Sequence, residues 1–282
     1  MMESLDQATA LRRQGRKRAR PPILGIVSGK GGVGKSALAV NLAMASSAAG
    51  ARTLLVDADA GLANADLLLG AIPRFDLSDW CGGRIHAREA LCPVAEGFDL
   101  VVSGRGRAVA HALLAAVKGD DPGELGAMFS EADLTLLDLG AGIGASVLEL
   151  ASACDPIWLV VTPEPTSLAD AYAMVRELWA LRPSARVEIV VNRAVDLETG
   201  ERTYQALQRL TRRFLGRELP LRGVLFEDES MGRSVVRQIP VVRAAPRSRI
   251  ARQLALLAES LVEDAPPGRF ESMPAAPPSL PG

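Results

Sequence analysis

Cysteines, aromatic residues and long apolar runs are all scarce in this sequence of 282 residues. The three cysteines, Cys81, Cys92 and Cys154, form neither a C-x-x-C pair nor an even set, which argues against a disulfide framework and favours a reducing compartment. No apolar run approaches the roughly 20 residues of a membrane span, and no apolar signal-peptide region follows the N-terminus. We therefore expect a cytoplasmic protein, for which any membrane association would be peripheral, at the inner face of the membrane or at a cell pole.

Basic and acidic residues nearly balance one another, with 32 of the first kind, 33 of the second and a net charge of −1. Such a chain has no overall attraction for nucleic acid, and we expect no specific nucleic-acid binding. The basic residues are unevenly placed, because the first 20 residues hold six of them against Glu3 and Asp6. Aromatic residues make up 4% of the chain and hydrophobic residues 48%, which predicts a core built from Leu, Val and Ala.

A glycine-rich loop lies between a predicted strand, 23–28, and a predicted helix, 36–49. The loop fits the pattern G-x-x-x-x-G-K-[ST], in which backbone N–H groups and a helix N-terminus surround phosphate groups. Its residues are Gly29, Lys30, Gly31, Gly32, Val33, Gly34, Lys35 and Ser36. The pattern places Lys35 along the β- and γ-phosphates and the Ser36 hydroxyl on Mg²⁺. The alternative is a glycine-rich turn that holds no nucleotide, which the strand and helix on either side disfavour.

Strands and helices alternate from Ile23 onward, which predicts an α/β fold with a mostly parallel, doubly wound sheet and helices on both faces. The predicted strands are 23–28, 52–57, 98–102, 133–138, 157–161, 187–191 and 221–225. The predicted helices are 36–49, 107–117, 145–152, 166–181, 200–214, 228–238 and 247–263. We expect a basic N-terminal segment over 1–21, one nucleotide-binding α/β domain over 22–264, and a disordered proline-rich tail over 265–282.

Carboxylates follow two of the predicted strands at the end where open α/β sheets bind ligands. Asp57 and Asp59 share a strand face by their spacing and should point towards the phosphate loop. Asp138 ends an apolar strand and is followed by a glycine-rich turn, as in a Walker B segment, which places it to hold Mg²⁺ through water. Both features also fit a simpler explanation, in which the aspartates only stabilise the turns that follow their strands.

The tip of the predicted strand 187–191 is a candidate for binding the nucleotide base. Asn192 offers both an amide donor and an amide acceptor, which suits the edge of an adenine, and Arg193 follows it. Asparagine is also common in turns, so a purely structural role stays open.

These motifs, in this order, resemble the MinD/ParA-type ATPases, which are single-domain P-loop NTPases of the SIMIBI class, and the resemblance covers roughly residues 22–263. Lys30 is similar to the early lysine of their deviant Walker A loop, and the resemblance implies that it reaches the nucleotide of a partner subunit in an ATP-dependent homodimer. A contact with the chain's own phosphates is the alternative. The resemblance further implies a slow, Mg²⁺-dependent ATP hydrolase, with Asp59 positioning the attacking water, Asp57 beside the magnesium site and Asn192 on the base.

Two segments narrow the resemblance to the FlhG (FleN/YlxH) branch, which controls flagellar number. Residues 161–172, VTPEPTSLADAY, resemble a segment of that branch, and the N-terminus resembles its D-Q-A-x-x-L-R activator motif. The matching residues are Asp6, Gln7, Ala8, Leu11 and Arg12. The resemblance implies that this motif stimulates an FlhF-type GTPase. It also implies flagellar switch (C-ring) proteins and a flagellar transcription regulator as further partners.

Two departures from the family stand out. Phe226 occupies a turn where the family usually has proline. In the family this turn makes a second contact with the nucleotide base, and that contact does not follow for this chain from the resemblance. The tail 265–282 holds six prolines where relatives carry a basic amphipathic membrane-binding helix, so membrane recruitment does not follow from the resemblance. Two other functions stay open, a ParA-like partitioning ATPase that binds DNA nonspecifically and a nucleotide-locked adaptor that hydrolyses nothing.

Overall fold

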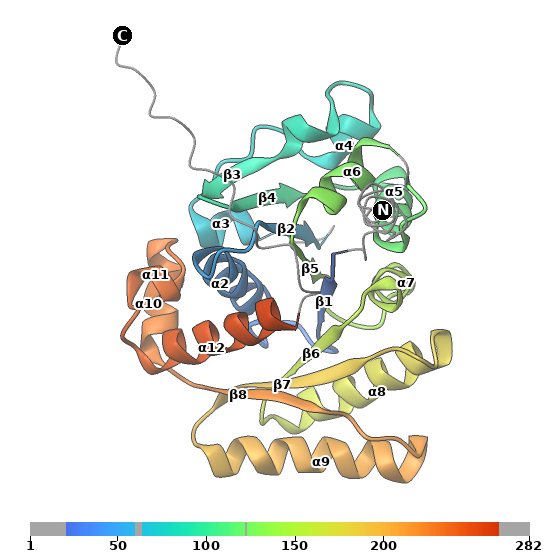
Figure 1. Cartoon of the computed structure of the whole chain (residues 1–282). Coiled ribbons are helices and arrows are strands. Elements are labelled where there is room, and N and C mark those ends of the chain that lie inside the picture. The colour runs from blue at the N-terminus through green and yellow to red at the C-terminus, as the bar shows by residue number, and fades with distance from the viewer. Residues whose placement is uncertain (1–20, 60–63, 122, 265–282) are drawn as a thin grey trace, which may run out of the picture.

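An eight-stranded sheet runs through the middle of the molecule, as the computed structural model shows for residues 21–59, 64–121 and 123–264 (Figure 1). Its strand order is β3-β4-β2-β5-β1-β6-β7-β8, and every neighbouring pair is parallel except β3 with β4. The strands are β1 (Ile23–Val27), β2 (Thr53–Ala58), β3 (Cys92–Ala95), β4 (Phe98–Val102), β5 (Leu134–Leu139), β6 (Ile157–Val161), β7 (Val187–Ala194) and β8 (Leu221–Phe226). The predicted α/β fold with a mostly parallel sheet is confirmed.

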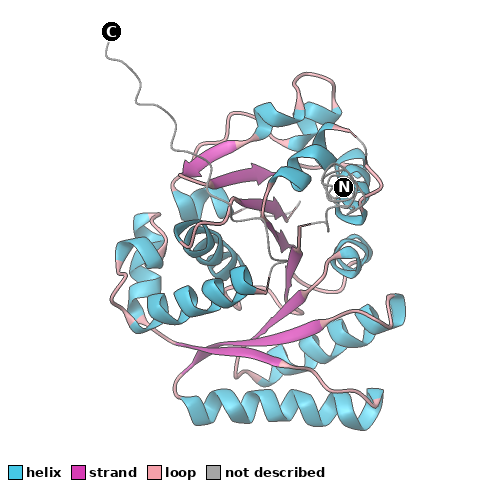
Figure 2. Ribbon diagram, viewed as in Figure 1, coloured by secondary structure: helices cyan, strands magenta, loops and turns pink. Residues whose placement is uncertain are grey.

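Helices cover both faces of this sheet (Figure 2). They are α2 (Lys35–Ala48), α3 (Ala65–Leu69), α4 (Leu77–Cys81), α5 (Arg107–Lys118), α6 (Glu124–Glu131), α7 (Ala145–Ala153), α8 (Pro165–Leu181), α9 (Leu197–Leu215), α10 (Glu229–Arg237), α11 (Val241–Ala244) and α12 (Arg249–Glu263), with a 3₁₀ turn, η1, at Ala87–Ala90. All seven predicted helices are present. The unpredicted elements are short, and β3 lies at a sheet edge and contains Pro93, which weakens a sequence signal for a strand.

Side chains alternate along each strand, so the core is divided into two clusters, one on each face of the sheet. Ile23 and Val27 of β1 belong to a cluster packed with α5 to α9, whereas Leu24 and Ile26 join a second cluster with α2 and α12. Both clusters are built mainly from Leu, Val, Ile and Ala, as the composition predicts. Because the central strands are buried on both faces, their sequences are almost entirely apolar, and the polar residues lie at the strand ends.

Side-chain caps set several helix starts. Asp196 accepts a hydrogen bond from the backbone N–H of Thr199, so α9 begins at Leu197, three residues before the predicted start. Gly200 then lies within the helix, where a Cβ atom would approach Val224 to 2.4 Å. Close packing of α9 on the sheet therefore explains why Gly200, where the helix was predicted to begin, lies inside it.

The predictions for residues 1–20 and for the tail from 265 onward lie outside the described residues. This includes the activator motif with Asp6, Gln7, Ala8, Leu11 and Arg12. Within the described residues, none of the helices is long and apolar enough to cross a membrane.

Candidate nucleotide-binding site

The glycine-rich loop and the predicted carboxylates meet at the carboxyl edge of the sheet. The loop follows β1, Asp57 lies near the end of β2, and Asp138 lies near the end of β5. The parallel register places Asp57 directly beside Asp138 and Asp138 beside Ile26 of β1. These three strands lie at the centre of the sheet, so residues more than 100 positions apart converge on the start of α2.

Two glycines of the loop occupy positions that a larger residue could not. A Cβ atom on Gly29 would lie 2.3 Å from the backbone carbonyl of Asp170 in α8. Gly34, which precedes α2, has a φ of 90°, and a Cβ atom there would approach the side-chain amide of Asn192 to 2.5 Å. The loop is thus held closely between α8 and the end of β7, with Gly31 and Gly32 exposed at its tip.

A buried ion pair joins Lys35 of the loop to Asp138 at the end of β5. The Nζ atom of Lys35 lies 2.6 Å from Oδ1 of Asp138, and the two side chains are only 7% and 1% exposed. The other oxygen of Asp138, Oδ2, is buried and has no hydrogen-bond partner among the described residues. A carboxylate oxygen without a donor is costly in a protein interior, and a cation or a water on a cation would satisfy it.

Asp57 is fully buried and accepts three backbone hydrogen bonds, from the N–H groups of Asp59, Asn64 and Ala65 at 3.2, 2.9 and 2.9 Å. Burial and, to a smaller extent, the charge of the nearby Asp138 raise the pKa of Asp57 to about 6, against the opposing effect of these hydrogen bonds. Asp57 therefore holds both ends of the connection between β2 and α3. This structural task was not predicted from the sequence.

The predicted placement of Asp59 needs a correction. β2 ends at Ala58, so Asp59 follows the strand and does not share a strand face with Asp57. Its backbone turns back towards the Asp57 carboxylate, and its Oδ1 atom would lie 3.6 Å from a Cβ atom on Gly140. Asp59 is thus near the turn that follows Asp138, on the same edge of the sheet.

Lys30 is held within the chain. Its Nζ atom lies 2.6 Å from Oε2 of Glu164 and 3.0 Å from the Thr166 hydroxyl, both in the segment that begins α8. The hydrogen bond and charge of Lys30 lower the pKa of Glu164. Glu164 was not predicted as a partner of Lys30, although Glu164 and Thr166 both belong to the segment 161–172 that resembles the FlhG branch.

Asn192 and Arg193 lie beside the same loop. The side-chain amide nitrogen of Asn192 donates to the carbonyl of Val33 at 2.8 Å, so in this structure the residue supports the loop. Arg193 has a φ of 56°, and its charge helps to lower the pKa of Glu164. The base-binding role of both residues stays a prediction.

Phe226, at the end of β8, is 8% exposed, and its ring packs into the core. The guanidinium of Arg249 lies 3.4 Å from the ring centroid. Phe226 therefore joins the sheet to the start of α12.

The residues at this edge fit a magnesium nucleotide. Mg²⁺ prefers a few oxygen ligands and uses substrate phosphates for others, and the Ser36 hydroxyl with the unpartnered Oδ2 of Asp138 would supply that kind of ligand. Across residues 21–59, 64–121 and 123–264, no group of three or more His, Cys, Asp or Glu side chains could hold a metal by itself. A site that depends on phosphate oxygens would have few protein ligands.

Comparison with protein families gives the same assignment. A family model for the CobQ/CobB/MinD/ParA nucleotide binding domain matches residues 24–241. The chain belongs to this family. The predicted MinD/ParA membership is therefore confirmed, and with it the class of enzyme, an ATP hydrolase.

Two relatives are similar over most of their length. The antiactivator FleN of Pseudomonas aeruginosa is 35% identical over 85% of this chain and 85% of its own. The flagellum site-determining protein YlxH of Helicobacter pylori is 28% identical over 88% of this chain and 84% of its own. Among solved structures, MinD from Pyrococcus horikoshii, complexed with Mg-ADP, aligns with a TM-score of 0.69 and 24% identity, covering 86% of this chain and 96% of that one. The chain is thus a MinD/ParA-family ATPase similar to the FleN and YlxH proteins.

Proposed function

We propose that this chain is an ATP-dependent dimerising switch that regulates the number, placement and assembly of flagella. The observation that carries the proposal is the pair of lysines at the phosphate loop. Lys35 forms a buried ion pair with Asp138, and Lys30 forms a partly exposed ion pair with Glu164. The similarity to YlxH, a flagellum site-determining protein, supports the flagellar role. The similarity to FleN and the segment 161–172 point to the same branch.

For nucleotide binding, we assign Lys35 to the phosphate oxygens, and Ser36 and Asp138 to Mg²⁺, with Asp57 fixing the connection beside them. When bound, Mg²⁺ would neutralise charge on the phosphate oxygens. Lys35→Ala should lower ATP affinity about ten- to hundredfold, because a charge-assisted contact contributes roughly 1.5–3 kcal/mol. Calorimetric titration of ATP tests this, and unchanged affinity would exclude the assignment.

For hydrolysis, we assign Asp59 to orienting the attacking water, because it lies at the same edge of the sheet as Asp138 and outside the rigid strand. Positioning of the water is most of what phosphoryl transfer requires from a protein. Asp59→Ala should bind ATP and accumulate as a dimer while its turnover falls to near background. Turnover equal to that of the wild type would move this role to another residue.

For dimerisation, we assign Lys30 to the nucleotide of the partner subunit. Lys30 then has to leave Glu164 and Thr166, an exchange that is feasible because both members of the ion pair are partly exposed. Lys30→Ala should bind ATP and remain monomeric in sedimentation with ATP and Mg²⁺. The matched control is Glu164→Gln, which removes the ion pair, keeps the lysine and should still dimerise. If Lys30→Ala dimerises as tightly as the wild type, the cross-subunit role is wrong.

For the partner, we propose that residues 6–12 stimulate an FlhF-type GTPase. Ala8 and Leu11 give a small apolar face at helical spacing, and Gln7 is an amide able to orient water in a GTPase site. The full chain and a peptide of residues 1–20 should both accelerate GTP hydrolysis by such a partner, and Gln7→Ala should not. An unchanged GTPase rate with both wild-type forms would remove the support for this partner.

The ParA-like alternative has less support. Its basic surface would come in part from α9 and the residues just after it, with Arg209, Arg212, Arg213 and Arg217. Arg212 is paired with Glu218, and the guanidinium groups of Arg213 and Arg217 lie over the rings of Phe214 and Trp179. These last three arginines already make local contacts that a phosphate backbone would have to replace. Affinity for random DNA that falls steeply with salt concentration would favour this alternative.

A further inference from the structure

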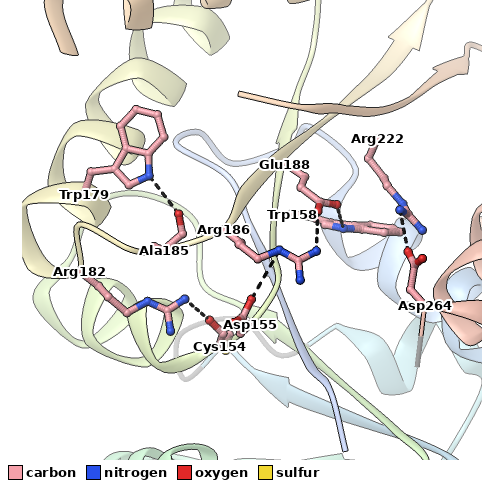
Figure 3. Close-up of polar contacts among 10 residues, drawn as sticks. All are labelled: Cys154, Asp155, Trp158, Trp179, Arg182, Ala185, Arg186, Glu188, Arg222 and Asp264. Carbon is pink, nitrogen blue, oxygen red and sulfur yellow. Dashed lines mark hydrogen bonds and ion pairs between the residues drawn. The ribbon is translucent and has the colours of Figure 1, made fainter. Parts of the chain in front are cut away.

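Arginine side chains in this protein commonly pair with a nearby carboxylate, as Figure 3 shows beside β6. There Arg186 lies 3.1 Å from Glu188, and Arg222 lies 2.9 Å from Asp264. Each pair satisfies the charge of its arginine within the chain. The segment that contains α10 and α11 is different, because its arginines outnumber the carboxylates beside them.

Residues 230–258 form this basic segment. The 29 residues hold six arginines and neither a lysine nor an acidic residue, although the charges of the whole chain nearly balance. All six are exposed, and they are Arg233, Arg237, Arg243, Arg247, Arg249 and Arg252. Arg233 pairs with Glu229, and Arg249 lies over the ring of Phe226. The other four make no hydrogen bond, ion pair or ring contact within the described part of the chain, so their charges are available to a partner.

The same segment exposes apolar side chains on and after α10. Val236 is 84% exposed, and its neighbours Val235 and Ile239 are each 42% exposed. The inner side of α10 and α11 is already used, because Met231 and Val242 pack against the core cluster that contains α2. The exposed side chains therefore have no packing role in the core of the chain.

A second segment extends this apolar area. A Cβ atom on Gly70, in the turn after α3, would lie 3.1 Å from the backbone carbonyl of Gln238, so this turn lies against the end of α10. Ile72 follows two residues later and is 92% exposed. Ile72 and Val236 have the largest exposed fractions among the large hydrophobic residues that the structure describes. We call the combined area the α10 surface, formed by Ile72, Val235, Val236 and Ile239 with Arg233, Arg237 and Arg243.

The α10 surface stands on a firmly held support at the outer edge of the molecule (Figure 1). Asp228 accepts hydrogen bonds from the backbone N–H groups of Ser230 at 2.8 Å and Ile250 at 3.3 Å, which joins the start of α10 to α12. Asn41 of α2 accepts from the N–H of Val242 at 3.1 Å. Because the support is ordered before any partner arrives, docking there loses little conformational entropy on this side.

Gly232 is the most informative residue of the helix. It lies inside α10, one turn before Val236, where glycine is less favourable than alanine. The fold does not require it, because the position is exposed and a Cβ atom would meet nothing within 4 Å. A glycine on an exposed helix face lets the backbone of another molecule come close. Packing against a partner therefore explains a glycine that packing within the chain does not.

We propose that the α10 surface binds an acidic amphipathic helix of a partner protein. The apolar stripe of that helix covers Val236 and Ile72, and its closest approach is at Gly232. Its flanking carboxylates pair with the arginines, whose planar guanidinium groups match a carboxylate with two parallel hydrogen bonds. Helices that dock on a protein surface use this arrangement of apolar anchors at helical spacing. None of the residues involved has a part in the proposed nucleotide chemistry, so the proposal goes beyond that function.

Two other classes of partner fit this composition less well. Membrane-binding faces combine lysine and arginine with tryptophan, phenylalanine or leucine, whereas residues 230–258 hold neither lysine nor an aromatic residue. A nucleic-acid backbone would engage the arginines but would leave Val236 and Ile72 in water. Protein interfaces have an apolar centre, are enriched in arginine and are depleted in lysine, which is the pattern seen here.

Binding of a labelled peptide to the full-length chain, followed by fluorescence anisotropy, tests the proposal. The probe is a helical peptide of about 20 residues with leucines at helical spacing and glutamates on both sides of the stripe. A matched peptide carries lysines in place of the glutamates. The glutamate peptide should bind with an affinity that falls as salt concentration rises, and the lysine peptide should not bind. A wild-type chain that does not bind the glutamate peptide would overturn the proposal.

Matched variants locate the binding site. Val236→Asp should weaken binding about tenfold, whereas Leu181→Asp, an exposed position at the end of α8, adds the same charge elsewhere and should have no effect. Gly232→Gln should weaken binding while the melting temperature stays equal or rises, because the position is open and glutamine favours a helix. A purely structural role of Gly232 would not separate these two measurements. Unchanged ATP affinity in each variant confirms that the domain is folded.

A charge exchange distinguishes the partner class. Arg237→Glu/Arg243→Glu should lose the glutamate peptide and bind the lysine peptide. Equal binding by Val236→Asp and the wild type would contradict the proposal. Binding of phosphatidylglycerol vesicles or random duplex DNA that Val236→Asp abolishes would assign the surface to another occupant and overturn it. Self-association without nucleotide that is lost in Val236→Asp would do the same, because the occupant would then be a second copy of the chain.

Discussion

Replacing Lys35 should destabilise the nucleotide-free protein as well as prevent nucleotide binding. The Nζ atom of Lys35 and Oδ1 of Asp138 are 2.6 Å apart, and both side chains are almost completely buried. At an effective dielectric constant of about 20, their attraction is about 6 kcal/mol, most of which offsets the cost of removing two charges from water. Lys35→Met keeps the aliphatic stem but leaves the Asp138 carboxylate buried without a counter-charge. Removing one member of a buried pair costs about 3–5 kcal/mol.

A loss of this size should lower the melting temperature by roughly 6–20 °C, because 1 kcal/mol corresponds to about 2–4 °C in a domain of this length. Thermal and urea unfolding without nucleotide measure it. Lys30→Ala is the matched control, since its ion pair with Glu164 is exposed and its loss should leave the melting temperature nearly unchanged. The double variant Lys35→Met/Asp138→Asn removes the isolated charge and should recover part of the loss. If Lys35→Met is as stable as Lys30→Ala, the buried pair does not stabilise the fold.

Two further predictions concern the loop and a surface histidine. Gly29→Ala should destabilise the domain strongly, because its Cβ atom would lie 2.3 Å from the Asp170 carbonyl, whereas Gly31→Ala meets nothing within 4 Å and should unfold as the wild type does. The hydrogen bond to Glu124 raises the pKa of His86, so its contribution to stability is present below the ordinary pKa of about 6.5 and is lost as pH rises through the value in the folded protein. An NMR titration should show a raised pKa that Glu124→Gln returns towards 6.5; an unchanged value in that variant would contradict the assignment.

The local sequence was enough to predict the fold class and the position of the site. Central strands such as β1 and β5 are buried on both faces, so they are continuous apolar runs, and a parallel sheet brings the residues at their carboxyl ends together. The phosphate loop is a contiguous motif whose chemistry depends on neighbours in the chain, so the local sequence was enough to name Lys35 and Ser36 as candidate ligands. Short elements such as α3 and the edge strand β3 contain too few residues to show a hydrophobic periodicity, so the sequence did not predict them.

Contacts between distant segments were decided only by the tertiary structure. The sequence could place Lys30 and Glu164 on separate motifs but could not show that they pair, because their contact depends on how α8 packs beside the loop. Asp57 matched a ligand pattern, yet its carboxylate is occupied by backbone N–H groups that the turn into α3 brings to it. The side-chain amide of Asn192 likewise donates to the carbonyl of Val33, because the end of β7 lies beside the loop. Residue type and spacing determine which groups are available at a strand end, and packing determines which of them remain free to bind a ligand.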